Sequence, residues 1–177
     1  MPETTSTKPI ITPLPADDAL AGDVSQIVGD FFSKSVRLRH APGRPHRVAN
    51  MQPASPLPYG ASVEIVGAGG CTVTVGFDAD AATGVTKALL GIPADADSPE
   101  CADALGEVAN IIAGRLKCKL ALAGDAEVKL GLPRRFDGEP QPGRAGGECV
   151  ALPVKLDPGT MLVEVQPTAP QDAAVAA

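Results

Sequence analysis

Three polar residues, Asp103, Glu107 and Asn110, lie four and then three positions apart, a spacing that suits one face of an α-helix. Leu105 and Ile112 fall on another face, so the polar row is expected to point outward. Asparagine is a poor residue for a helix interior because its amide competes for backbone hydrogen bonds. A carboxamide can also hold a water molecule, since it both donates and accepts hydrogen bonds. The row indicates either a functional surface or an ordinary solvated helix face.

The helix that carries this row is expected over residues 98–120. Ser98 is a good N-cap residue, and Pro99 is tolerated in the first helical turn. The apolar residues of the segment recur at helical spacing and predict its buried face. These residues are Leu105, Val108, Ile112, Leu116 and Leu120.

Two further helices are expected upstream. The first begins near Asp17 or Asp18, either of which can cap it, and continues with apolar residues at helical spacing. The second begins near Asp78 or Asp80 and is ended by Gly91, a residue that readily adopts the left-handed conformation at a helix C-terminus.

Alternation of apolar and polar residues predicts an antiparallel hairpin over 62–65 and 71–77, joined by the glycine-rich link 67–70. A strand follows this link where a phosphate-binding loop needs a helix N-terminus, so a tight turn is expected instead. Three more strands are expected, around 128–132, 148–154 and 161–165. The order of elements favours an α+β fold, with an antiparallel sheet and helices packed on one face.

The folded domain is expected to span residues 17–166. Residues 1–16 hold four prolines and four threonines without an apolar period, which is typical of a disordered tail. Residues 167–177 are expected to form a second disordered tail. The segment 37–58 is interrupted by prolines and is expected to be a solvated loop with room for one edge strand.

Composition excludes several classes of partner. The 177 residues carry a net charge of −6, and only 3% are aromatic. The negative net charge argues against binding to the phosphate backbone of a nucleic acid, and the scarcity of aromatic residues argues against stacking on its bases. No apolar stretch of membrane-spanning length and no secretory signal is recognisable, so the chain is expected to be cytoplasmic, without a membrane partner.

The remaining chemistry-bearing residues are scattered. The cysteines show no C-x-x-C pairing and are expected to be reduced, packed thiols: Cys71, Cys101, Cys118 and Cys149. A local basic cluster consists of Arg37, Arg39, His40, Arg44, His46 and Arg47. It is either a solvated loop or a patch that meets an acidic partner. Two histidines without a neighbouring carboxylate do not predict a metal site.

The polar row belongs to a longer pattern: Asp103, three residues, Glu107, two residues, Asn110, twenty-two residues, Pro133. This pattern and the surrounding ALGEVANIIAGRLK resemble the motif of the chemotaxis phosphatases CheC, CheX and FliY. CheC and FliY usually carry two such motifs, so a chain with one is most similar to CheX. The resemblance covers about residues 18–166 and is strongest over 98–133.

The resemblance implies a CheC/CheX-like fold and a phosphatase that hydrolyses the aspartyl phosphate of a CheY-like receiver domain. It implies that Asn110 orients the attacking water and that Glu107 pairs with a lysine of the receiver, which makes these two the catalytic residues. Asp103 then lies on the same receiver-binding face, and Pro133 shapes the segment beside the helix. The resemblance also implies that the protein has no cofactor of its own, because Mg²⁺ would belong to the receiver, and that it forms a homodimer.

Two other functions are compatible with the same resemblance. The first is a receiver-binding adaptor or scaffold that uses this face without catalysis. The second is a CheX-like fold reused for self-assembly through a sheet edge. The rate at which a receiver loses its phosphate, compared between the wild-type protein and Asn110→Ala, distinguishes the enzyme from the adaptor.

Overall fold

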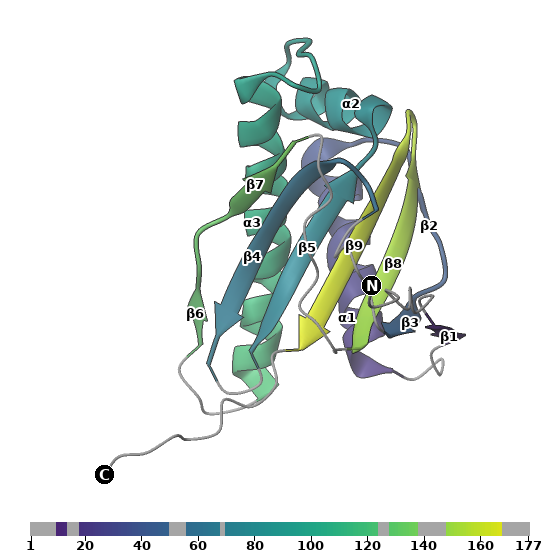
Figure 1. Ribbon diagram of the computed structural model, residues 1–177, viewed down its shortest axis with the longest axis vertical. Coiled ribbons are helices and arrows are strands. Elements are labelled where there is room, and N and C mark those ends of the chain that lie inside the picture. The colour runs from purple at the N-terminus through teal and green to yellow at the C-terminus, as the bar shows by residue number, and fades with distance from the viewer. Residues whose placement is uncertain are drawn as a thin grey trace, which may run out of the picture.

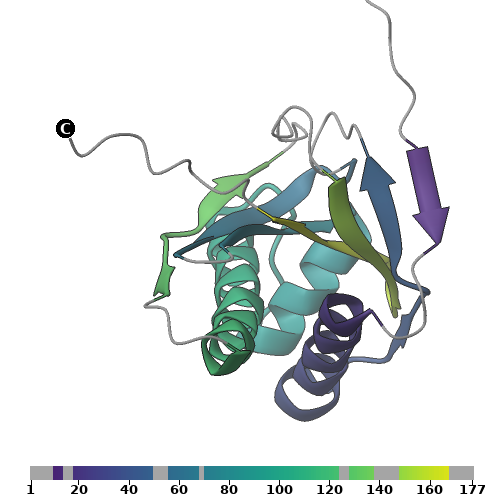
Figure 2. The same ribbon diagram turned by 90° about the horizontal axis from the view of Figure 1, so that it is seen from below.

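A single antiparallel sheet organises the chain, and the helices cover one of its faces (Figure 2). The computed structural model describes residues 10–13, 18–49, 56–67, 70–123, 128–137 and 148–167. Within these residues the strand order is β1-β3-β8-β9-β5-β4-β6, with β2 paired to β8 and β7 to β4 (Figure 1). The strands are β1 (Ile10–Pro13), β2 (His40–Pro42), β3 (His46–Ala49), β4 (Tyr59–Val66), β5 (Cys71–Phe77), β6 (Lys129–Leu130), β7 (Arg134–Phe136), β8 (Glu148–Leu156) and β9 (Thr160–Pro167). This arrangement confirms the expected α+β fold.

The helices begin at side-chain caps that the sequence contains. The Asp18 carboxylate accepts a hydrogen bond from the Ala21 amide at the start of α1 (Ala19–Asp30). Asp78 makes the equivalent contact with Ala81 at the start of α2 (Ala79–Leu90). The structure thus selects Asp78 over Asp80 as the cap.

The ends of the helices are also set by local chemistry. A π-helical segment, η1 (Phe31–Val36), extends α1. Gly91 ends α2 at φ 73°, in the left-handed region that glycine adopts without steric cost. Ser98 accepts a hydrogen bond from the Cys101 amide at the start of α3 (Pro99–Ala123), as its sequence position predicts.

The core lies between the helices and one face of the sheet. The central hairpin places Val63 of β4 opposite Val73 of β5, in agreement with the alternation of the sequence. Helix α3 packs against β4 and β5 through side chains such as Leu105 and Ile112, each 1% exposed. The helix therefore lies beneath the β4 side of the sheet (Figures 1 and 2).

Two segments differ from the sequence-based expectation. The described part of the segment 37–58 contains two strands, β2 and β3, where room for one was expected. The strand expected around 128–132 is only β6, and a further strand, β7, follows it. Leu132 does not continue an apolar alternation, because its side chain is 89% exposed.

The two expected tails fall largely outside the described residues. Strand β1 lies within the segment 1–16 and pairs with β3, with Ile10 opposite Ala49. At the other end of the chain, β9 extends to Pro167, the first residue of the second expected tail.

Candidate functional site

The polar row lies on the surface of α3. Asp103 and Glu107 are exposed and Asn110 is partly exposed. Leu105 and Val108, on the opposite side of the same turns, are buried against the sheet. The helical period therefore brings the three predicted residues together on one accessible face, as the sequence indicated.

A cation that the sequence analysis did not select lies beside this row. Arg135 of β7 forms an ion pair with Asp103, and both side chains remain more than half exposed. Its guanidinium passes over Gly106, where an added Cβ would lie 3.2 Å from Arg135 Nε. The absence of a side chain at position 106 thus allows the arginine to lie close against the helix.

Pro133 lies at a break in the pairing of β4 with β6 and β7. This break determines whether Arg134 or Arg135 faces α3. Strand β4 pairs with β6 at Ile65 and Leu130, and with β7 at Ser62 and Arg134. Three steps along β4 therefore correspond to four along its partner, which is a bulge of one residue. A proline suits such a break in an edge strand because it has no backbone N–H to donate to the ladder.

The bulge shifts the alternation of the strand that follows it. Arg135 is paired with Ala61, a buried residue on the helix-covered face of β4. Paired residues of antiparallel strands project to the same face, so Arg135 projects toward α3. Arg134 alternates to the other face. The only sequence signal for this arginine is its position two residues after Pro133.

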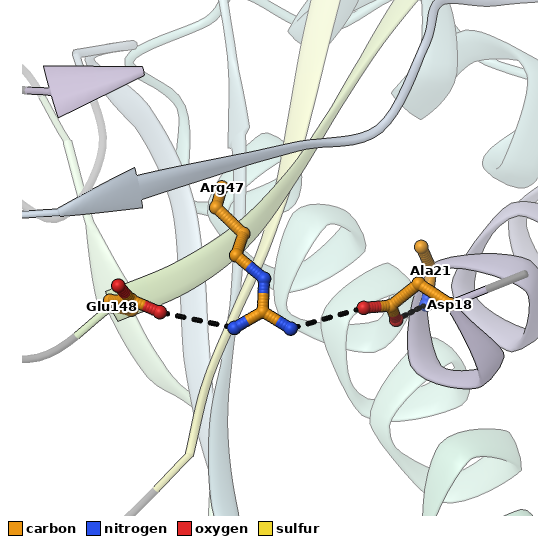
Figure 3. Close-up of polar contacts among 4 residues, drawn as sticks. All are labelled: Asp18, Ala21, Arg47 and Glu148. Atoms are coloured by element: carbon orange, nitrogen blue, oxygen red, sulfur yellow. Dashed lines mark hydrogen bonds and ion pairs between the residues drawn. The ribbon is translucent and has the colours of Figure 1, made fainter. Parts of the chain in front are cut away.

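The basic cluster of residues 37–47 does not join this face. Strands β2 and β3 lie on the β8 side of the sheet, whereas β7 and α3 lie on the β4 side (Figure 2). Arg47 is occupied by two ion pairs, with Asp18 at 3.1 Å and Glu148 at 3.0 Å (Figure 3). The amide of Ala21 chiefly, and Arg47 in addition, lower the pKa of Asp18. Arg47 thus ties the start of α1 to β3 and β8.

The two histidines have local partners. His40 Nδ1 lies 3.1 Å from the carbonyl oxygen of Leu38, and its ring lies 5.6 Å from that of Phe32. His46 Nδ1 lies 3.3 Å from the carbonyl oxygen of Arg44. Across the described ranges, no group of three or more His, Cys, Asp or Glu side chains is placed to hold a metal ion.

The buried cysteines are poor nucleophiles. Burial raises the pKa of Cys71 to about 11 and that of Cys149 to about 12. Burial also raises the pKa of Cys101, whose sulfur lies 3.2 Å from the Thr86 hydroxyl. The reactive thiolate is therefore scarce at neutral pH at these positions. Cys118 of α3 is exposed.

Glu164 is the most perturbed carboxyl among the described residues. It lies on β9, between Thr74 of β5 and Ala151 of β8, and its side chain is on the opposite sheet face from the helices. The residue is 3% exposed, and neither carboxylate oxygen has a hydrogen-bond partner in the part of the chain that the structure describes. Burial raises the pKa of Glu164 to about 9, so the group is neutral at pH 7. It is separate from the row on α3.

The sequence profile of the family described as "Chemotaxis phosphatase CheX" matches residues 59–155. This range is more than half of the chain and extends from β4 through α3 and Pro133 into β8. The chain belongs to the CheX family. A search of curated proteins found no significant match. None of the described helices is long and apolar enough to cross a membrane.

Solved structures share the fold of this CheX-family chain. A chemotactic CheC-like protein from Shewanella oneidensis is 20% identical, with a TM-score of 0.70 over 84% of this chain and 97% of its own. CheX from Desulfovibrio desulfuricans is 22% identical, with a TM-score of 0.69 over 84% of this chain and 99% of its own. The CheX–CheY–BeF₃–Mg²⁺ complex from Borrelia burgdorferi contains a chain that is 21% identical. Its TM-score is 0.60, over 85% of this chain and 96% of its own. The CheX-family chain thus has the CheX/CheC-like fold.

Proposed function

We propose that this protein binds the receiver domain of a CheY-like response regulator and hydrolyses its aspartyl phosphate. The observation that carries the proposal is the exposed row of Asp103, Glu107 and Asn110 on α3 of a CheX-family fold. In addition, a structural neighbour from Borrelia burgdorferi has been crystallised as a complex of CheX with CheY. The protein is proposed to act in the cytoplasm and as a homodimer.

The proposed chemistry needs positioning more than a strong base. An aspartyl phosphate is an acyl phosphate with a good leaving group, and phosphoryl transfer depends mainly on alignment and charge neutralisation. The Asn110 carboxamide is proposed to orient a water molecule in line with the phosphorus. Water attacks phosphorus, the bond to the aspartyl oxygen breaks, and inorganic phosphate and the free carboxylate are released. The Mg²⁺ in this proposal belongs to the receiver, not to this chain.

Glu107 is proposed to dock the receiver. It lies one helical turn before Asn110 and is exposed. A salt bridge from its carboxylate to a receiver lysine would place the Asn110 amide in the cleft that holds the phosphate. Asp103 lies one turn further along the same receiver-binding face.

The direct test is a time course of phosphate loss from CheY-like receivers of the source organism, with and without this protein. We expect the wild-type protein to accelerate the loss. Asn110→Ala should reduce the acceleration about a hundredfold or more, because the water is no longer aligned, while binding is retained. Glu107→Lys should abolish both binding and acceleration. Asp157→Lys, which changes an exposed carboxylate in the turn between β8 and β9, serves as the control for the change of charge and should keep both.

The outcomes separate an enzyme from an adaptor. Receiver binding by the wild-type protein with an unchanged phosphate lifetime would identify a non-catalytic adaptor or scaffold. Neither binding nor acceleration with any receiver of the organism would refute the proposed function. Acceleration that survives Asn110→Ala would refute the role of this residue.

A further inference from the structure

The first half of the receiver-binding face of α3 is acidic, and the structure places an arginine of β7 beside it. Glu100, Asp103 and Glu107 are exposed within two turns of the helix, in a chain with net charge −6. The proposed partner carries a phosphoryl group, which is also anionic. Two negative surfaces repel each other unless a cation lies between them. Arg135 is the cation that the structure places next to Asp103.

Among the described residues, Arg135 is paired with Asp103 alone, so its guanidinium has hydrogen-bonding capacity to spare. It carries five N–H donors, and the pair with Asp103 is made through Nη1. The arginine side chain is 54% exposed, so donors remain accessible to a partner. The planar fork matches the geometry of a phosphoryl group or a carboxylate, which an ammonium group does not.

The same contacts fix the arginine before any partner arrives. Asp103 holds Nη1, Gly106 allows the side chain to approach the helix, and pairing with Ala61 fixes the backbone of β7. A side chain that is ordered in advance loses less conformational entropy on binding. The Pro133 bulge produces this placement, since it directs Arg135 toward α3.

Resting on the proposed function, we infer that Arg135 is a receiver-docking residue. Its guanidinium, oriented by Asp103, binds an anionic group of the phosphorylated receiver, either the phosphoryl oxygens or a carboxylate beside them. Asp103 is then a positioning residue that acts through Arg135. The competing explanation is structural, in which the ion pair only fastens β7 to α3.

The test measures affinity for a receiver domain loaded with beryllofluoride and Mg²⁺, and for the same receiver unloaded. Arg135→Ala should raise the Kd for the loaded receiver about tenfold or more, as is common for an arginine at an interface hot spot. Arg135→Lys should recover only part of this loss. The dependence of Kd on salt should become weaker in Arg135→Ala, because one charge contact is lost. Arg134→Ala removes the neighbouring arginine, which alternates to the other face of the strand, and should bind as the wild type does.

A variant with both charges exchanged separates docking from fastening. Asp103→Arg combined with Arg135→Asp keeps an ion pair between β7 and α3 but moves the cation to the helix. A structural role predicts restored binding, whereas docking by Arg135 predicts that the affinity stays low. The thermal unfolding midpoint, measured for every variant, shows that each one is folded.

Each outcome has a defined meaning. A loss confined to the loaded receiver supports contact with the phosphoryl group, and an equal loss for both forms supports contact with a receiver carboxylate. Wild-type affinity and salt dependence in Arg135→Ala would overturn the inference and leave the proposed function intact. Absence of receiver binding by the wild-type protein would overturn both.

Discussion

The buried carboxyl of Glu164 is expected to make the stability of the fold depend on pH. This carboxyl is buried without a hydrogen-bond partner among the described residues, and burial raises its pKa from 4.5 to about 9. Below pH 4.5 the group is protonated in both the folded and unfolded states. Between pH 4.5 and 9 the unfolded chain loses this proton while the folded chain keeps it. The contribution of Glu164 to stability therefore falls as the pH rises through this window.

We expect Glu164→Gln to remove this pH dependence. The amide has the shape of the protonated acid but cannot ionise. Relative to the variant, the wild-type free energy of unfolding should fall by up to about 1.4 kcal/mol per pH unit between pH 5 and 8.5. Urea unfolding at several pH values measures the difference. Asp157→Asn, which changes an exposed carboxylate in the turn between β8 and β9, should keep the fall in stability with rising pH. Parallel profiles for Glu164→Gln and the wild type would contradict the prediction.

The residues of the candidate site could be predicted only in part from the sequence. Asp103, Glu107 and Asn110 could be selected because helical spacing is local and is written directly in the sequence. Arg135 could not, because its direction depends on a strand register that involves β4. Without the bulge, Arg134 would project toward the helix instead.

Among the elements, α2 is the one most clearly fixed by a single side chain. Asp78 Oδ1 accepts a hydrogen bond from the Ala81 amide at 2.8 Å, and Oδ2 accepts one from the Thr160 amide at 2.8 Å. The same carboxylate thus begins α2 and anchors the start of β9. Gly159, at φ 90°, leaves room for this contact, because an added Cβ would lie 2.4 Å from Asp78 Oδ1.

We expect Asp78→Ala to destabilise the protein by about 2 kcal/mol, since it removes a helix cap and a second hydrogen bond to the backbone. The matched control is Asp80→Ala, which removes an exposed carboxylate from the first turn of the same helix. It should cost less than about 1 kcal/mol through the helix dipole alone. Urea unfolding measures both. Equal losses in the two variants would show that neither the cap nor the contact with Thr160 contributes beyond the helix dipole.

The elements with strong local signals were predictable, and those defined by long-range pairing were not. The three long helices and the central hairpin follow from caps and periodicity. Strands β2 and β3 are three and four residues long and contain polar and proline residues, so their sequence resembles a loop. They form because β8 offers an edge, with Arg47 opposite Val150 and Ala41 opposite Lys155.

At the scale of the whole molecule, the structure separates the basic cluster of residues 37–47 from Arg135. The basic cluster of residues 37–47 lies on the β8 side of the sheet, and Arg135 lies on the β4 side beside α3. The sequence alone left open whether the basic cluster meets an acidic partner. The sheet order places this cluster away from the proposed receiver-binding face (Figure 2).

Neutralising the basic cluster should therefore leave receiver binding nearly unchanged. The suitable variant is Arg39→Ala with Arg44→Ala, since both side chains are exposed, whereas Arg47 is excluded because its ion pairs join α1 to the sheet. Salt at physiological ionic strength screens exposed charges over about 8 Å, which limits the influence of these arginines on a contact at the β4 side of the sheet. At about 0.15 M salt, the Kd for the beryllofluoride-loaded receiver should change less than about twofold, against about tenfold for Arg135→Ala. A tenfold loss in the double variant would place the receiver contact on the basic cluster instead.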